Sequence, residues 1–154
     1  MIPVTKTYLP SIETYNARVK QIWDSGVLTN RGAFVQELEK KLKNEFSLNH
    51  LLCTNNGTIP IQIALKLYGN KGEIITTPFS YVATTATIQW EGCIPVFVDI
   101  DEDHWTISPK KIKEAITPKT TCILATHVFG NPCDIEEIES IAKQYNLKVI
   151  YDAA

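Results

Sequence analysis

The sequence predicts an α/β protein with a mostly parallel sheet flanked by helices, and three observations support this class. From about residue 50 onward, short apolar runs alternate with longer amphipathic stretches, the rhythm of successive βα units. The apolar fraction of 44% and the charged fraction of 21% are ordinary for a globular protein, so 154 residues should build a packed core. No apolar stretch reaches the ~18 residues that indicate a membrane-spanning helix.

Five apolar runs are expected to form the strands, because each is rich in Ile, Val, Leu or Cys. They are His50 to Thr54, Glu73 to Thr77, Pro95 to Asp99, Thr121 to Val128 and Lys148 to Asp152. Their near-continuous apolarity predicts burial on both faces of the sheet. In a parallel sheet their C-terminal ends share one edge, which is where ligands bind.

Helices are expected between these strands and before them. Those between the strands are Tyr81 to Trp90, Ser108 to Ile116 and Asp134 to Tyr145, the last two opening with a Ser-Pro and an Asp cap. Two more precede the sheet, at about Ile12 to Asp24 and Phe34 to Phe46. The polar loop that joins these two, residues 25–32, carries two glycines and is a candidate for more than a linker.

One segment is ambiguous from its own residues. Between residues 59 and 68 the apolar positions fit both the alternation of a strand and the stripe of a helix. Pro60 favours a helix, because the first turn does not need its missing N–H. Thr54, Asn55 or Asn56 would then serve as the cap.

Charge and cysteine usage exclude several kinds of site. Lys and Arg number 15 against 17 Asp and Glu, and the basic residues are scattered, so no nucleic-acid footprint is visible.

The start at Met1 to Val4 lacks the features of a signal peptide, so we expect a cytoplasmic protein. No C-x-x-C pair and no metal-ligand spacing occurs, so we expect buried reduced thiols and no metal site. The residues concerned are Cys53, Cys93, Cys122, Cys133, His50, His104 and His127.

The turn Thr54-Asn55-Asn56-Gly57-Thr58 has the features of a phosphate site, since it leads from a strand into a helix start. Free backbone N–H groups and the helix dipole favour an anion there. Gly57 would let the backbone approach closely, and Thr58 would add a hydroxyl donor. A purely structural turn is the other interpretation. Neither dinucleotide nor nucleoside triphosphate binding has its glycine fingerprint in this chain.

Two other features fall at the same sheet edge. Asp152 closes an apolar strand, where a carboxylate is either a functional group or a helix cap. The segment from Thr77 to Thr85 places two aromatic residues and several hydroxyls after another strand. Phe79 and Tyr81 are either core residues or a surface that stacks on a flat heterocycle.

Six segments taken in order carry a resemblance that covers essentially the whole chain. They are Leu28–Gly32, Asn56–Thr58, Pro78–Thr84, Pro95–Asp99, Thr126–Gly130 and Asp152–Ala154. Together they resemble the DegT/DnrJ/EryC1/StrS family of pyridoxal-phosphate-dependent sugar aminotransferases. The resemblance implies the large domain of fold type I transferases, a helix at the ambiguous segment, and a homodimer. Residues 1–48 would be a helical segment with a substrate-side loop, and residues 49–154 the N-terminal part of the cofactor-binding large domain.

The resemblance also implies roles for individual residues. Asn56, Gly57 and Thr58 match the turn that binds the phosphate of pyridoxal 5'-phosphate. Tyr81 matches the aromatic residue that stacks on one face of the pyridine ring, and Ala154 matches the small residue under the other face. Asp152 matches the catalytic acid that pairs with the pyridine nitrogen. Asn30 and Arg31 lie in a loop that resembles the family's substrate-side loop.

The activity that the resemblance implies is transfer of an amino group from an amino acid, glutamate, to a nucleotide-linked keto sugar. The family's Schiff-base lysine would lie beyond residue 154, so we expect the chain to be an N-terminal fragment without transaminase activity of its own. Apolar surface left uncovered would favour self-association. The alternatives are a dehydratase of the same fold, in which histidine replaces the lysine, and a non-catalytic α/β paralogue.

Overall fold

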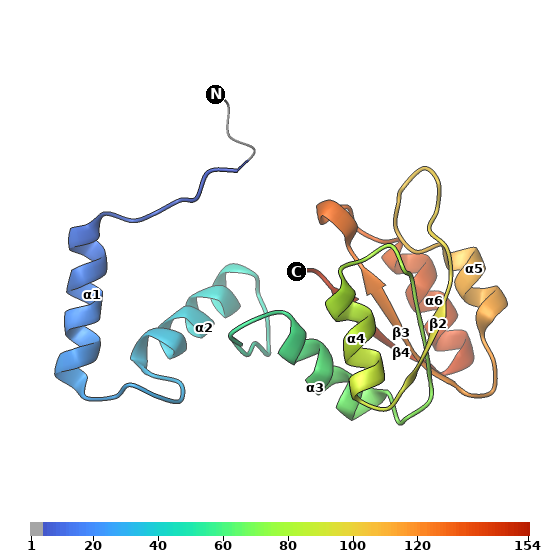
Figure 1. Cartoon of the computed structure of the whole chain (residues 1–154), viewed down its shortest axis with the longest axis horizontal. Helices are drawn as coiled ribbons and strands as arrows, with labels where there is room; N and C mark the ends of the chain where they lie inside the picture. Colours follow the sequence, from blue (N-terminus) through green and yellow to red (C-terminus); the bar gives the residue numbers. More distant parts are fainter. Residues whose placement is uncertain (1–4) are drawn as a thin grey trace. The chain divides into compact units, whose positions relative to one another are not determined.

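The computed structural model describes residues 5–154, which divide into two compact units, one ending at Cys53 and the other spanning Thr54–Ala154 (Figure 1). The residues Met1 to Val4, on which the expectation of no signal peptide rested, lie outside the described part. Within residues 5–154, no helix combines the length and the apolar character that crossing a membrane requires. The functional division expected after residue 48 stays a prediction.

The second unit is built on a four-stranded parallel sheet with the strand order β2-β1-β3-β4. Its strands are β1 (Glu73–Thr76), β2 (Ile94–Phe97), β3 (Thr120–Thr126) and β4 (Lys148–Asp152). The α/β class with a parallel, helix-flanked sheet is therefore confirmed. All four strands end at the same edge, because parallel strands run in one direction.

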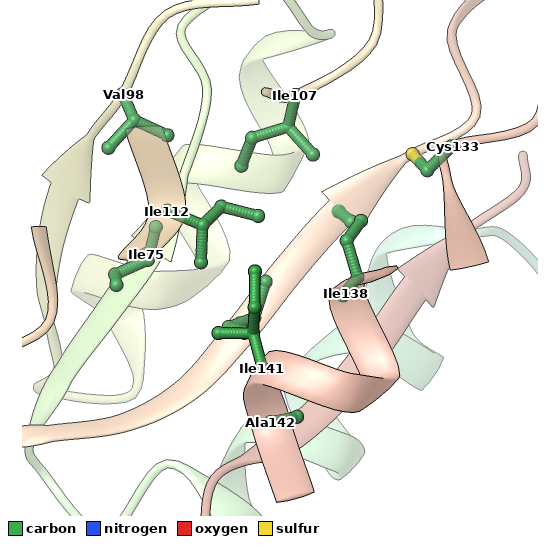
Figure 2. Close-up of a cluster of buried hydrophobic side chains, with 10 residues drawn as sticks. Ile75, Val98, Ile107, Ile112, Cys133, Ile138, Ile141 and Ala142 are labelled. Atoms are coloured by element: carbon green, nitrogen blue, oxygen red, sulfur yellow. The ribbon is translucent and has the colours of Figure 1, made fainter. Parts of the chain in front are cut away.

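Helices cover both faces of this sheet. They are α3 (Thr58–Tyr68), α4 (Val82–Trp90), α5 (Pro109–Ala115) and α6 (Ile135–Tyr145), with a 3₁₀ turn at Val128–Gly130. Successive strand residues point to opposite faces, so Ile74 joins the cluster under α3 and α4 while Ile75 joins the cluster under α5 and α6. Figure 2 shows the second cluster, in which Ile138 and Ile141 of α6 lie over β3.

Four of the five expected strands are confirmed, and the fifth, His50 to Thr54, is wrong. This segment, which the structure describes in full, forms neither a helix nor a strand. The Cys53 N–H donates to the Glu39 side chain, at 3.0 Å from Oε1, instead of joining a ladder. Apolar residues make a strand only where another strand is available to accept and donate the backbone hydrogen bonds.

The prediction that every strand is buried on both faces is only half right. The two inner strands are buried almost throughout, whereas β2 and β4 contain mostly half-buried or exposed residues. β2 and β4 are the outer members of the described sheet, so each has a strand on one side only. Apolar composition alone does not distinguish an inner strand from an outer one.

The helix predictions hold, including the ambiguous segment, which forms α3. Gly57 occupies the cap position of α3, and the preceding side chain of Asn56 supplies the cap bond, since its Oδ1 accepts the N–H of Ile59 at 3.0 Å. Asp134 caps α6 in the same way, accepting the N–H of Glu137 at 3.0 Å. Ser108 occupies the cap position of α5 without a side-chain cap bond, and Pro109 opens the helix.

The described part of the first unit, residues 5–53, contains two helices, α1 (Ile12–Ser25) and α2 (Ala33–Glu45), as expected. Ser11 caps α1, and Gly26 ends it with a left-handed φ of +66°. No residue of α1 is buried, and Glu39 is the one buried residue of α2. Local interactions therefore account for these helices more than tertiary packing does.

Candidate functional site

A cavity of about 610 Å³ lies in the second unit, at the edge where β3 and β4 end. Five segments supply its wall: the start of α3, the stretch between β1 and α4, the first turn of α4, the end of β3 with the turn after it, and the end of β4. The lining residues are Gly57, Thr58, Ile61, Pro78, Phe79, Ser80, Tyr81, Ala83, Thr84, Thr126, His127, Val128, Phe129, Asp152 and Ala154. The parallel topology therefore collects five of the predicted site residues of this unit at one place, whereas the sixth, Asn56, is not among the lining residues.

Asp152 supplies the carboxylate of this wall, and its side chain is held at both oxygens. The residue is 9% exposed; Oδ2 accepts the hydroxyl of Thr84 at 2.8 Å, and Oδ1 accepts the N–H of Ala154 at 3.2 Å. No lysine or arginine is among the lining residues. A buried carboxylate without a cationic partner favours a ligand that brings a positively charged donor.

The start of α3 forms another part of the wall. Gly57 and Thr58 line the cavity, and Asn56 stabilises the turn by capping the helix. A Cβ placed on Gly57 would lie 3.1 Å from the Cβ of Ala154, so glycine allows the turn to approach the end of β4 closely. A helix N-terminus brought against a cavity in this way provides N–H groups for an anion.

The aromatic residues of the cavity are not core residues, so that interpretation of Phe79 and Tyr81 is wrong. Tyr81 immediately precedes α4 and is 79% exposed. Phe79 packs edge-to-face against Trp105 and Phe129, with ring centroids 6.2 Å and 6.1 Å apart. The Tyr81 ring is thus available to a ligand, while Phe79 belongs to a small aromatic cluster.

Four polar lining residues received no individual role from the sequence: Ser80, Thr84, Thr126 and His127. The Nδ1 atom of His127 accepts the N–H of Cys133 at 3.0 Å, and its ring stacks on Tyr151 at 5.1 Å between centroids. Burial raises the pKa of Tyr151 to about 12. The sequence showed the hydroxyl-rich segment and the Thr126–Gly130 motif. It did not show that these groups meet, because the hydrogen bonds that join them link residues 46 and 68 positions apart.

The predicted substrate residues Asn30 and Arg31 belong to the first unit. They lie between α1 and α2 in left-handed conformations, with φ of 55° and 54°, and border a second cavity of about 370 Å³. Arg31 pairs with the buried Glu39 at 2.6 Å. The Cys53 N–H, and after it the Arg31 guanidinium, lowers the pKa of Glu39 below its ordinary value of 4.5. The substrate role of Asn30 and Arg31 stays a prediction.

The cysteines are free thiols, as expected, and three of the four are buried; Cys53 is half-buried. Burial raises the pKa of Cys122 to about 12 and also raises that of Cys133. Both are therefore neutral thiols at neutral pH. In residues 5–154, no three His, Cys, Asp or Glu side chains form a group that could hold a metal ion.

The chain is similar to sugar-modifying enzymes. It is 48% identical over 153 residues to the dTDP-4-amino-4,6-dideoxy-D-glucose transaminase of Escherichia coli, covering 99% of this chain and 41% of that protein. It is 35% identical over 156 residues to the GDP-perosamine synthase of Escherichia coli O157:H7, covering 99% of this chain and 42% of that protein. The chain thus spans about two fifths of the length of these curated relatives.

Solved structures agree with these sequence matches. DesI, crystallised in the presence of its TDP-sugar product, superposes with a TM-score of 0.88 at 30% identity, over 94% of this chain and 37% of that one. NtdA of Bacillus subtilis, with bound cofactor PMP, superposes with a TM-score of 0.87 at 34% identity. The match covers 92% of this chain and 33% of that one. The profile of the DegT/DnrJ/EryC1/StrS aminotransferase family matches residues 11–154. The chain therefore belongs to the DegT/DnrJ/EryC1/StrS aminotransferase family.

Proposed function

We propose that the cavity of the second unit binds pyridoxal 5'-phosphate, and that the whole protein transfers an amino group from glutamate to a nucleotide-linked keto sugar. The observation that carries this proposal is the carboxylate of Asp152, which is buried in the cavity wall, hydrogen-bonded at both oxygens and unpaired with any cationic lining residue. Such a group suits the protonated ring nitrogen of this cofactor.

The residues present fit the cofactor. Gly57 and Thr58 at the start of α3 would bind its phosphate through backbone N–H groups and the Thr58 hydroxyl, with Asn56 holding the turn. The exposed ring of Tyr81 would cover one face of the pyridine ring, and the small Ala154 leaves room for the other face. Asp152 would hold a proton on the ring nitrogen. When bound, the cofactor supplies an electron sink for removal of the substrate's Cα proton.

The substrate class is argued from the relatives and from the fold. Two of them are named for a dTDP-linked and a GDP-linked amino sugar, and DesI was crystallised with a TDP-sugar product. We place Asn30 and Arg31 on the sugar-nucleotide side of the reaction, because the relatives match this chain across both units. Glutamate is the amino donor in this proposal.

Homodimer formation and a cytoplasmic location complete the proposal. The apolar residues of α1, including Ile12, Tyr15, Val19 and Trp23, are exposed and repeat at helical spacing, so they form a face suited to a second copy. The four cysteines are all free, which suits a reducing compartment. Light scattering after size-exclusion chromatography tests the first point, and a monomer at micromolar concentration would contradict it.

The 154-residue chain is proposed to be inactive by itself. No lysine lies in the wall of the described cavity, so no side-chain amine there can bond covalently to the cofactor or move a proton at the reacting carbon. Incubation with pyridoxal 5'-phosphate, glutamate and a keto sugar nucleotide should give no amino sugar. Turnover above a cofactor-free blank would overturn this part of the proposal.

Binding is best tested with pyridoxamine 5'-phosphate, because its amine cannot form adventitious imines with surface lysines. Titration of the chain, followed by ligand fluorescence, should show one saturable site. Pyridoxamine without the phosphate is the matched control and should bind more weakly, since it cannot use the N-terminus of α3. Equal affinity for the two ligands would contradict the phosphate assignment, and no saturable binding would contradict the cofactor site.

A further inference from the structure

We propose that three hydroxyl groups from three segments of the second unit form one directed hydrogen-bond relay that fixes the Asp152 carboxylate. The relay runs Thr126, Ser80, Thr84, Asp152. It makes Thr84 and Ser80 positioning residues, which act on a bound ligand only through Asp152. Its consequence for ligand binding rests on the proposed function, whereas the relay itself is a property of the chain alone.

The contacts form a continuous line. The Oγ1 atom of Thr84 lies 2.8 Å from Oδ2 of Asp152, and Ser80 Oγ lies 2.7 Å from that same Oγ1 atom. Thr126 Oγ1 lies 3.1 Å from Ser80 Oγ. The participants come from β3, from the stretch before α4, from α4 itself and from β4. The relay therefore joins four of the five segments that make the cavity wall.

The direction of each bond follows from counting protons. A carboxylate only accepts, so Thr84 gives its single hydroxyl proton to Asp152. Its oxygen must then accept the proton of Ser80, and the Ser80 oxygen must in turn accept the proton of Thr126. All three dipoles consequently point toward the negative charge, and each bond polarises the next.

Burial makes Thr84 the decisive member. Its side chain is fully buried, so water cannot readily replace its hydroxyl next to Asp152. The N–H of Ala154 occupies the other carboxylate oxygen, at 3.2 Å. With both oxygens held, the plane of the carboxylate is fixed relative to the cavity. A positively charged ring donor then meets a carboxylate that needs no reorientation.

Thr84→Val tests the relay, with Thr84→Ser and Thr87→Val as matched variants. Valine keeps the shape and removes the donor, and serine restores it. Thr87 is another buried threonine of α4, but its hydroxyl donates at 2.9 Å to the carbonyl of Thr84 and not to the carboxylate. We expect Thr84→Val to weaken pyridoxamine 5'-phosphate binding about tenfold, because a hydrogen bond to a charged group is lost. Thr84→Ser and Thr87→Val should stay within about twofold of wild type.

Two spectroscopic readouts separate positioning from folding. Circular dichroism in the ligand's absorption band, per mole bound, should fall in Thr84→Val and stay unchanged in Thr87→Val even where both lower the melting temperature. In the ligand-free chain, proton NMR should show a slowly exchanging Thr84 hydroxyl with a cross-peak to Ser80, lost in Thr84→Val. Ser80→Ala, which cuts the relay one step earlier, should weaken binding about two- to threefold.

The outcomes distinguish the two proposals. Equal binding and equal dichroism of Thr84→Val and Thr87→Val, or no protected hydroxyl in the wild-type chain, would overturn the relay. A protected Thr84 hydroxyl together with no saturable ligand binding by the wild-type chain would support the relay and overturn the cofactor site.

Discussion

The two units of this chain contain helices of similar length that are stabilised in different ways. In the second unit, α6 places Ile138, Ile141 and Ala142 in a core shared with β3 (Figure 2). In the first unit, α1 buries nothing and relies on the Ser11 cap and on the Lys20–Asp24 ion pair, 2.6 Å apart. Local signals are enough to specify a helix, whereas only long-range packing builds a site.

The difference extends to the charged residues. In the second unit the buried carboxylate of Asp152 receives two neutral donors and lines a cavity whose wall contains no lysine or arginine. In the first unit the buried carboxylate of Glu39 is already paired with Arg31 and accepts the Cys53 N–H. One carboxylate lines a cavity without a cationic partner, and the other is paired within its own unit.

The largest expected effect concerns the core. Ile123→Ala, in β3, should lower the free energy of unfolding of the second unit by about 3 kcal/mol, because the side chain is fully buried. Ile22→Ala, on the exposed face of α1, is the control and should change it by less than about 0.5 kcal/mol. Urea denaturation measures both. Equal losses would show that the two units do not differ as described.

Removal of the charge at the cavity should have the next largest effect. Asp152→Asn should weaken pyridoxamine 5'-phosphate binding by about 10- to 100-fold, because the charge-assisted bond to the ring nitrogen is lost. Asp134→Asn, at the cap of α6 and outside the cavity lining, should bind as wild type does. Fluorescence titration at one fixed pH measures both, and unchanged affinity of Asp152→Asn would contradict the assigned role.

Removing a helix cap should have a smaller effect, and each unit should show that effect in a different measurement. Asp134→Ala should lower the free energy of unfolding of the second unit by about 1 kcal/mol, through the lost bond to Glu137. Ser11→Ala should reduce helical circular dichroism with little change in that unfolding transition, since α1 buries no residue. A large shift of the transition by Ser11→Ala would mean that the units are stabilised together.

The smallest effect is a pH dependence in the first unit. The pKa of Glu39 is lowered by the Cys53 N–H and then by Arg31, so its stabilising contacts are complete above the ordinary value of 4.5. They are lost as the pH falls through the lowered value. The amide resonance of Cys53 should therefore stay constant from pH 7 down to that ordinary value and shift only in more acidic solution. Glu39→Gln should abolish the titration, and a shift in neutral solution would contradict it.

How far the sequence predicts the fold depends on the range of the interactions. Caps and helical stripes placed five of the six α-helices of residues 5–154 within a residue or two, because each is specified by neighbouring residues. The sixth, α3, was ambiguous from its own residues, and the family resemblance decided it. The segment His50 to Thr54 was misjudged because a strand depends on a partner elsewhere in the chain. The exposure of β2 was misjudged for the same reason, since its position in the sheet is a tertiary property.

The sequence alone determined the α/β class, the order of the helices and of four strands, and the candidates Gly57, Thr58, Tyr81 and Asp152, since local patterns and the family resemblance carry that information. Only the tertiary structure decided that these residues share one cavity and that Thr84, Ser80 and Thr126 align behind Asp152. The physical reason is that a hydrogen bond between residues 46 or 68 positions apart exists only once the sheet has brought them together.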